Sequence, residues 1–280
     1  MRPIPHAMHA GLRRGLIELR HTYTTTLDLW GQVFWPLAML VVLFFLRGAE
    51  FHGLSLATLV LPGMLGLTVV FNGLMGTSGH LCVDREDGTL LRARTTPYGV
   101  AGYLTGKIVL VTGWVVISVL ILLVPGTFLV GGLALGTAGT WLTLAWVVLL
   151  GTVAMIPIGA VVGSVMPNPR SQGMIMMPMA ALIAVSGIFY PLTALPVGLQ
   201  AVGQVFPVYW LGLGVRSALL PDEAVAVEVS GSWRHLETVG VLGVWAVAGA
   251  LVALVVLPRM TRRESGSTMA LRREKALRRV

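Results

Sequence analysis

Four consecutive charged side chains lie at residues 84–87 of the 280-residue chain, Asp-Arg-Glu-Asp. Gly88 and Thr89 follow and can form a turn and the start of a short helix, which Thr96-Pro97 then ends. Bases in such a segment are typical of an ordinary loop beside a membrane, because these loops collect Lys and Arg. Three acids within four residues are not explained in that way. We therefore expect this segment to contact another protein.

A second segment that could do chemistry is residues 102–108, Gly-Tyr-Leu-Thr-Gly-Lys-Ile, the nearest match to a phosphate-binding loop. It has three residues rather than four between its glycines, and Ile108 stands where the magnesium-binding Ser or Thr belongs. We therefore expect no cofactor to be bound by this chain. If ATP drives the protein, ATP and magnesium bind to a separate ATPase chain.

Catalytic and metal-binding patterns are also weak. The sequence has no His-Glu-x-x-His, no Gly-x-Ser-x-Gly and no paired carboxylates in an apolar segment. The methionines between Met174 and Met179 are soft ligands that suit copper(I), but they have no Cys or His partner, and methionine also fills apolar space. We expect neither an enzymatic site nor a metal site.

The composition indicates that these segments belong to a membrane protein. Hydrophobic residues make up 55% of the chain and charged residues 11%, against about 25% charged in a soluble domain. Six apolar runs approach the roughly 20 residues that cross a bilayer as a helix. The predicted spans are Trp30–Leu46, Leu54–Leu81, Ile108–Val130, Trp141–Val165, Met174–Tyr190 and Val239–Leu257. Gly132-xxx-Gly136 and Gly159-xxx-Gly163 have the spacing of close helix packing, although 34 glycines make it a weak signal.

The chain is therefore predicted to be an all-α integral membrane protein with one transmembrane domain, residues 1–280. Two apolar stretches within 191–221 are bounded by prolines and too short to span, so we expect an outer re-entrant helical hairpin between spans five and six. Six spans place 17 Lys and Arg on one side and three on the other. This asymmetry predicts that both termini are cytoplasmic.

Both ends of the chain are basic. Residues 9–28 place leucines and a tyrosine at helical spacing with Arg and Glu between them, which predicts an amphipathic helix on the inner membrane surface. A soluble helix packed on a partner is the alternative. The tail, residues 258–280, either binds anionic lipid or serves as a solvated orientation signal.

The charged loop, residues 82–107, resembles the membrane subunits of type-2 ATP-binding-cassette transporters, the permeases related to daunorubicin and multidrug exporters. Those proteins often carry Glu-Arg-Glu-x-Gly-Thr-Leu-Glu, then Thr-Pro, then Gly-Lys. Residues 84–90, Thr96-Pro97 and Gly106-Lys107 match this pattern, whereas Leu91 and Ala93-Arg94 depart from it.

A second resemblance runs from Ser186-Gly-Ile-Phe-Tyr-Pro191 to Arg216 and looks like the fifth span and outer hairpin of the same family. Phe206 stands where that family usually has Asn. Together the two segments place the resemblance over nearly the whole chain.

The resemblance implies a half-transporter in a bacterial plasma (inner) membrane. Two permeases, identical or paralogous, would pair, and two cytoplasmic ATPase subunits would dock on their inner loops. The residues implied in coupling to the ATPase are Asp84, Arg85, Glu86, Asp87, Gly88, Thr89, Leu90, Thr96 and Pro97. Substrate would pass between the protomers near spans one, two and five, where the chain offers Trp35, Phe44, Phe71, Asn72, Met174, Met177 and Phe189.

An apolar, adaptable lining of this kind favours export of hydrophobic or amphipathic small molecules, such as drugs or natural products. One alternative is a polysaccharide or glycolipid exporter permease of the same class, with Tyr190, Tyr209 and Trp210 near the interface. Another is a non-transporting scaffold or sensor subunit. The partners expected are therefore ATPase subunits, a second permease, membrane lipid and a small molecule, and not nucleic acid.

Overall fold

The computed structural model describes residues 3–24, 26–51, 54–95, 99–166 and 169–263, and this part of the chain is almost entirely helical. The strands β1 (Glu50–Phe51) and β2 (Leu54–Ser55) form a two-residue antiparallel pair. The helices are α1 Pro3–Thr22, α2 Thr26–Leu46, α3 Leu56–Val70, the π-helix η1 Phe71–Gly76, α4 Thr77–Glu86, α5 Thr89–Arg94, α6 Gly99–Leu129, α7 Ala138–Val165, α8 Gly173–Val185, α9 Val197–Val205, α10 Pro207–Leu219 and α11 His235–Arg263. Short 3₁₀ helices are η2 Pro169–Gln172, η3 Leu192–Ala194, η4 Asp222–Val227 and η5 Val229–Gly231.

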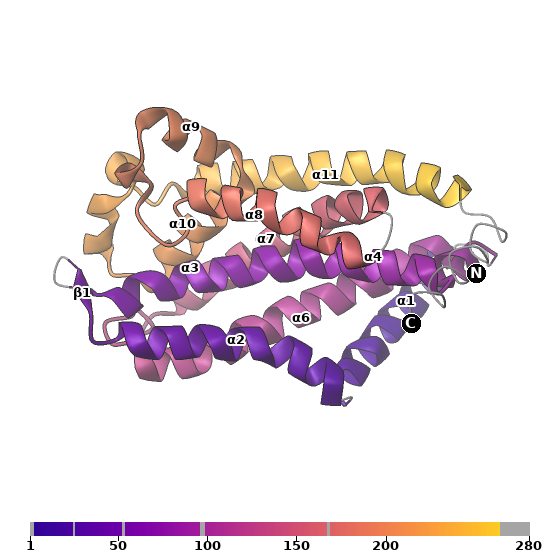
Figure 1. Cartoon of the computed structure of the whole chain (residues 1–280), viewed down its shortest axis with the longest axis horizontal. Coiled ribbons are helices and arrows are strands. Elements are labelled where there is room, and N and C mark those ends of the chain that lie inside the picture. The colour runs from indigo at the N-terminus through magenta and orange to yellow at the C-terminus, as the bar shows by residue number, and fades with distance from the viewer. Residues whose placement is uncertain (1–2, 25, 52–53, 96–98, 167–168, 264–280) are drawn as a thin grey trace.

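The long helices lie side by side along the long axis of the molecule (Figure 1). At one end, which we call the α1 end, lie α1, the end of α4 and the last turns of α11. At the other, the hairpin end, lie the strand pair, α9 and α10. The first described helix and the end of the last one thus lie at the same end of the bundle.

Among the described residues, five helical segments are long and apolar enough to cross a bilayer: Leu29–Leu46, Leu56–Glu86, Gly102–Leu129, Ala138–Val165 and His235–Met260. The prediction of an all-α membrane protein is confirmed. The fifth predicted span is the shorter helix α8, whose 13 residues extend about 20 Å at 1.5 Å per residue. The chain turns after it at Gly187, where φ is +59°.

The predicted hairpin consists of α9 and α10, joined at Pro207 in the first turn of α10, where its missing N–H costs no hydrogen bond. The two arms differ in burial. Most residues of α9 are exposed, whereas nearly all of α10 is buried against α3 and α7. The second arm is therefore part of the core and not a surface helix.

Glycines bring α7 against the α3–η1–α4 segment. A Cβ added at Gly159 would overlap the carbonyl oxygen of Leu74, and one at Gly163 would lie 2.8 Å from that of Ser78. This Gly-xxx-Gly pair therefore makes the close helix contact that its spacing suggested. The pair at 132–136 lies in the α6–α7 connection, outside any helix.

Candidate coupling site and transport face

The charged segment forms the turn between α4 and α5. Gly88 has φ 69° and ψ 13°, the left-handed conformation that glycine adopts without steric cost. The N–H of Asp87 donates to the carbonyl of Val83, as expected where a helix ends, and the N–H of Arg92 donates to the carbonyl of Gly88. The expected turn and short helix after Gly88 are therefore present.

Asp84 points into the protein and not toward a partner. Its side chain is buried, accepts a hydrogen bond of 2.7 Å from the Tyr103 hydroxyl and lies 3.0 Å from Lys107 Nζ. Both partners belong to α6. Asp84 therefore joins the end of α4 to α6.

Arg85 is also buried and turns to α7. Its Nη1 donates to the carbonyl oxygens of Met166, at 3.0 Å, and Ser164, at 3.3 Å. The last carbonyls of a helix have no partner within it and carry the negative end of its dipole. The guanidinium group thus caps the end of α7.

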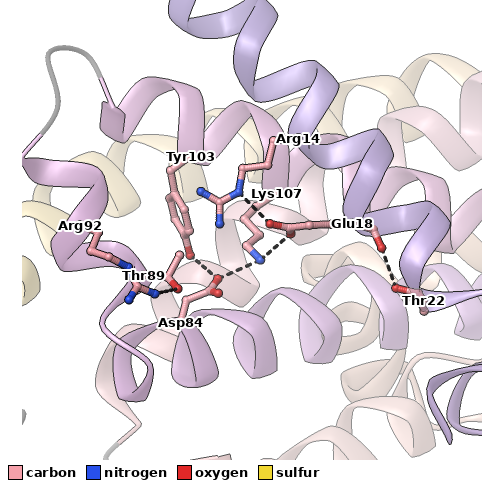
Figure 2. Close-up of polar contacts among 8 residues, drawn as sticks. All are labelled: Arg14, Glu18, Thr22, Asp84, Thr89, Arg92, Tyr103 and Lys107. Atoms are coloured by element: carbon pink, nitrogen blue, oxygen red, sulfur yellow. Dashed lines mark hydrogen bonds and ion pairs between the residues drawn. The ribbon is translucent and has the colours of Figure 1, made fainter. Parts of the chain in front are cut away.

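The ion pairs continue from α6 to α1. Lys107 Nζ lies 3.0 Å from Glu18 Oε2, and Arg14 Nε lies 2.8 Å from Glu18 Oε1 (Figure 2). We call Arg14, Glu18, Asp84, Tyr103 and Lys107 the basal network. Burial by itself raises the pKa of Glu18, but hydrogen bonds from Arg14 and Lys107 and their positive charges outweigh it, so the pKa is lowered below 4.5. The two acids and two bases of the network carry no net charge, and their contacts join α1, α4 and α6.

Paired glycines set the distance between α1 and α6. A Cβ at Gly11 would overlap the carbonyl oxygen of Gly102, and one at Gly15 would overlap that of Gly106. This close approach lets Glu18 reach Lys107. The segment that fails as a phosphate loop is therefore a helix-contact motif. The matching four-residue spacing at Gly11 and Gly15 was the sequence signal for it.

The other residues of the predicted coupling segment differ in whether their side chains face solvent or the core. Glu86, Asp87 and Arg92 are exposed, and Thr89 is half-buried and accepts a hydrogen bond from Arg92 (Figure 2). Leu90 is buried in a small cluster with residues of α4, α6 and α11. Thr96 and Pro97 lie outside the described residues. The outward surface is thus smaller than the predicted set.

The predicted transport residues lie on α2, on α3–η1 and on and after α8, and these helices occupy the side facing the viewer in Figure 1. Trp35 and Phe71 are brought together, with ring centroids 6.0 Å apart. The amide of Asn72 instead donates to the Thr68 carbonyl. Phe44 lies nearer the hairpin end, with the Arg47 guanidinium 3.9 Å from its ring centroid.

Helix α8 is weakly packed on the rest of the chain. Met174 and Met177 are 76% and 83% exposed, and Met179 is the buried residue of this helix. Phe189, just after it, is half-buried and lies beside Gly63 of α3. The methionines therefore offer a free apolar surface, whereas Phe189 belongs to the bundle wall.

A buried ion pair fixes the hairpin end. Arg216 of α10 donates from Nε to Glu228 Oε1 at 2.6 Å, and its Nη2 lies 3.4 Å from Oε2. Its Nη1 donates to the carbonyl oxygens of Gly187 and Ile188. One guanidinium thus joins α10, the turn after α8 and the connection to α11.

A family model described as ABC-2 family transporter protein matches residues 49–257, about three quarters of the chain. The chain belongs to the ABC-2 family of transporter proteins. Such a chain is the membrane permease component of an ATP-binding-cassette exporter and not its catalytic ATPase, and it works with an ATP-binding-cassette partner. No curated protein matches it. The match does not cover α1 and α2, so Arg14 and Glu18 of the basal network lie outside it.

Proposed function

We propose that this ABC-2 permease exports hydrophobic or amphipathic small molecules across a bacterial plasma membrane, with the α1 end in the cytoplasm. The observation that carries the proposal is the apolar surface of α2 and α8. Exposed apolar residues on it include Phe34, Trp35, Val41, Phe45, Met174 and Met177. Methionine and aromatic side chains repack around ligands of different shape.

This surface also suits pairing with a second permease. Helix α8 packs mainly on α9 and η2, and so leaves most of its length uncovered. Two copies that face each other through α2 and α8 would enclose a passage between them. The Trp35–Phe71 pair would line that passage, and Asn72 would supply a polar group beside it.

The polysaccharide alternative has less support. Tyr209 and Trp210, two of the three aromatic residues that it would use, are buried in the bundle, and the Trp210 indole donates to the Gln204 carbonyl. Buried rings cannot stack on sugars at the membrane surface. A small-molecule substrate is therefore the better match.

The ATPase would dock on the outward part of the α4–α5 turn. Glu86 and Asp87 present two exposed acids there, and the exposed Arg92 follows on α5. The exposed Leu12 and Leu16 of α1 fit the surface of the membrane at the same end. The excess of Lys and Arg at this end supports a cytoplasmic orientation.

The test is transport by the purified complex in vesicles. The permease is isolated with its co-purifying ATPase, and uptake of an amphipathic dye and of an oligosaccharide is compared. Glu86→Lys should assemble with its second permease but lose ATPase binding and dye transport. Glu223→Lys, an exposed acid at the hairpin end, is the control and should leave both intact. Oligosaccharide transport without dye transport would overturn the proposed substrate class, and full transport by Glu86→Lys would overturn the docking surface.

A further inference from the structure

A cavity of about 290 Å³ lies between α4, α6, α7 and α11, away from α2 and α8. Its lining is almost entirely apolar. Small residues make the room for it, with Ala160 on α7 and Ala250 and Ala253 on α11. The proposed function does not use this space.

The mouth of the cavity opens on the outer surface of the spans. Ile108 and Leu254 line it and are 48% and 67% exposed, whereas Val111 and Ala253 within it are buried. Ile108 and Leu254 belong to helices long enough to cross the bilayer. Hydrocarbon chains of the surrounding lipid therefore lie directly against the opening.

The cavity is elongated along the helices. On α6 its lining runs from Tyr103 to Val111, a rise of about 12 Å, and on α11 it runs from Ala250 to Leu257, about 10 Å. Helices that span a bilayer lie roughly along its normal, and so do the acyl chains of the lipids. The long axis of the space is thus parallel to a neighbouring acyl chain.

Between these mostly apolar walls, both a water molecule and an empty space are energetically unfavourable. A water molecule needs two to four hydrogen-bonding partners. Among the lining residues only Thr77, His80, Tyr103 and Lys107 carry polar side chains, and the rest of the wall offers water no partner. An empty cavity of this size forfeits the dispersion contacts of its walls. We propose that the cavity is a binding site for one acyl chain of a membrane lipid, which enters from the leaflet at the α1 end between Ile108 and Leu254.

An acyl chain in the cavity would contact two residues of the basal network, Tyr103 and Lys107. The side chains of Tyr103 and Lys107 line the cavity, while their polar ends bind Asp84. Filling the cavity therefore supports the groups that hold α1, α4 and α6 together. The site is independent of the proposed substrate and of the docking surface.

The test uses a phosphatidylcholine that carries a photoreactive diazirine in one acyl chain. The full-length protein is reconstituted with this lipid, washed with detergent to remove loosely held lipid, irradiated and mapped by mass spectrometry. Adducts should remain on lining residues such as Ile108 and Leu254 after washing, at least tenfold above the exposed Val124 of α6.

Two variants block the space. Ala253→Phe fills the interior, and Ala250→Phe closes the exposed edge without repacking the core. Each should reduce the retained adducts at least tenfold, while Leu251→Phe, on the exposed side of the same helix, should leave them unchanged. If Ala253→Phe fails to fold, Ala250→Phe decides the question. Adducts that wash off, that spread evenly over α6 and α11, or that persist in Ala250→Phe would overturn the assignment.

Discussion

Replacing Lys107 with Met should loosen the α1 end of the bundle. The ammonium group lies 3.0 Å from a carboxylate oxygen of Asp84 and of Glu18, and its side chain is only 14% exposed. Breaking a fully buried pair costs about 3–5 kcal/mol. Partial exposure, the Tyr103 bond to Asp84 and the Arg14 bond to Glu18 reduce this cost, so we expect about 2–3 kcal/mol.

The single cysteine of the chain reports this loss. Cys82 is buried on α4, two residues before Asp84, so its thiol reacts only when α4 opens locally. The labelling rate follows the population of that open state. Since 1.36 kcal/mol corresponds to a factor of ten, Lys107→Met should react roughly 30- to 150-fold faster than the native protein with a thiol-reactive fluorophore.

Two further variants separate the charge from the packing. Asp84→Asn added to Lys107→Met should recover part of the loss, because a neutral amide needs no counter-charge. Arg92→Met removes an exposed cation near the same turn and should leave the Cys82 rate unchanged. A Lys107→Met rate within twofold of the native rate, or an equal rise in Arg92→Met, would refute the claim that the basal network holds α4.

Three other perturbations test separate parts of the fold. Gly15→Val should displace α1 from α6, because its Cβ would overlap the Gly106 carbonyl, and a distance measured between spin labels on the two helices should increase and broaden. Arg216→Met should lower the stability of the bundle by about 3–5 kcal/mol, because it leaves Glu228 buried without its cation, and thermal unfolding should show the loss. Because the pKa of Glu18 is lowered, its pairing stabilises the network above the ordinary value of 4.5 and is lost as pH falls through the lowered value. The separation of α1 and α6 should thus stay constant from pH 8 to 5 and increase only in stronger acid, and an increase already near pH 6 would contradict this.

The membrane fold could be predicted because bilayer thickness fixes the length of an apolar helix, and hydropathy measures that length. The end of α8 could not. Residues 174–190 form an apolar run interrupted only by Pro178 and Ser186-Gly187, and the helix ends at Val185. The turn at Gly187 is held by the Arg216 guanidinium, 29 residues later, and no local pattern contains that contact.

The turn and the short helix after Gly88 could be predicted, but not the division of the neighbouring acids between two faces. Consecutive residues of a helix point about 100° apart, so two acids separated by one residue point in nearly opposite directions. Asp84 faces α6 and Glu86 faces outward. Which acid is buried depends on where Tyr103 and Lys107 lie, and that is a tertiary contact.

Because of the π-helical turn Phe71–Gly76, the number of residues in this span determines which way the later side chains point. A π turn holds one more residue than the α-helical turn it replaces. Deleting one residue there would restore an α-helix and rotate everything after it by about 100°. Asp84 and Arg85 would then leave α6 and α7, although the hydropathy of the span would hardly change. An alignment that opens a gap between Phe71 and Gly76 would therefore assign the residues of the α4–α5 turn to the wrong faces.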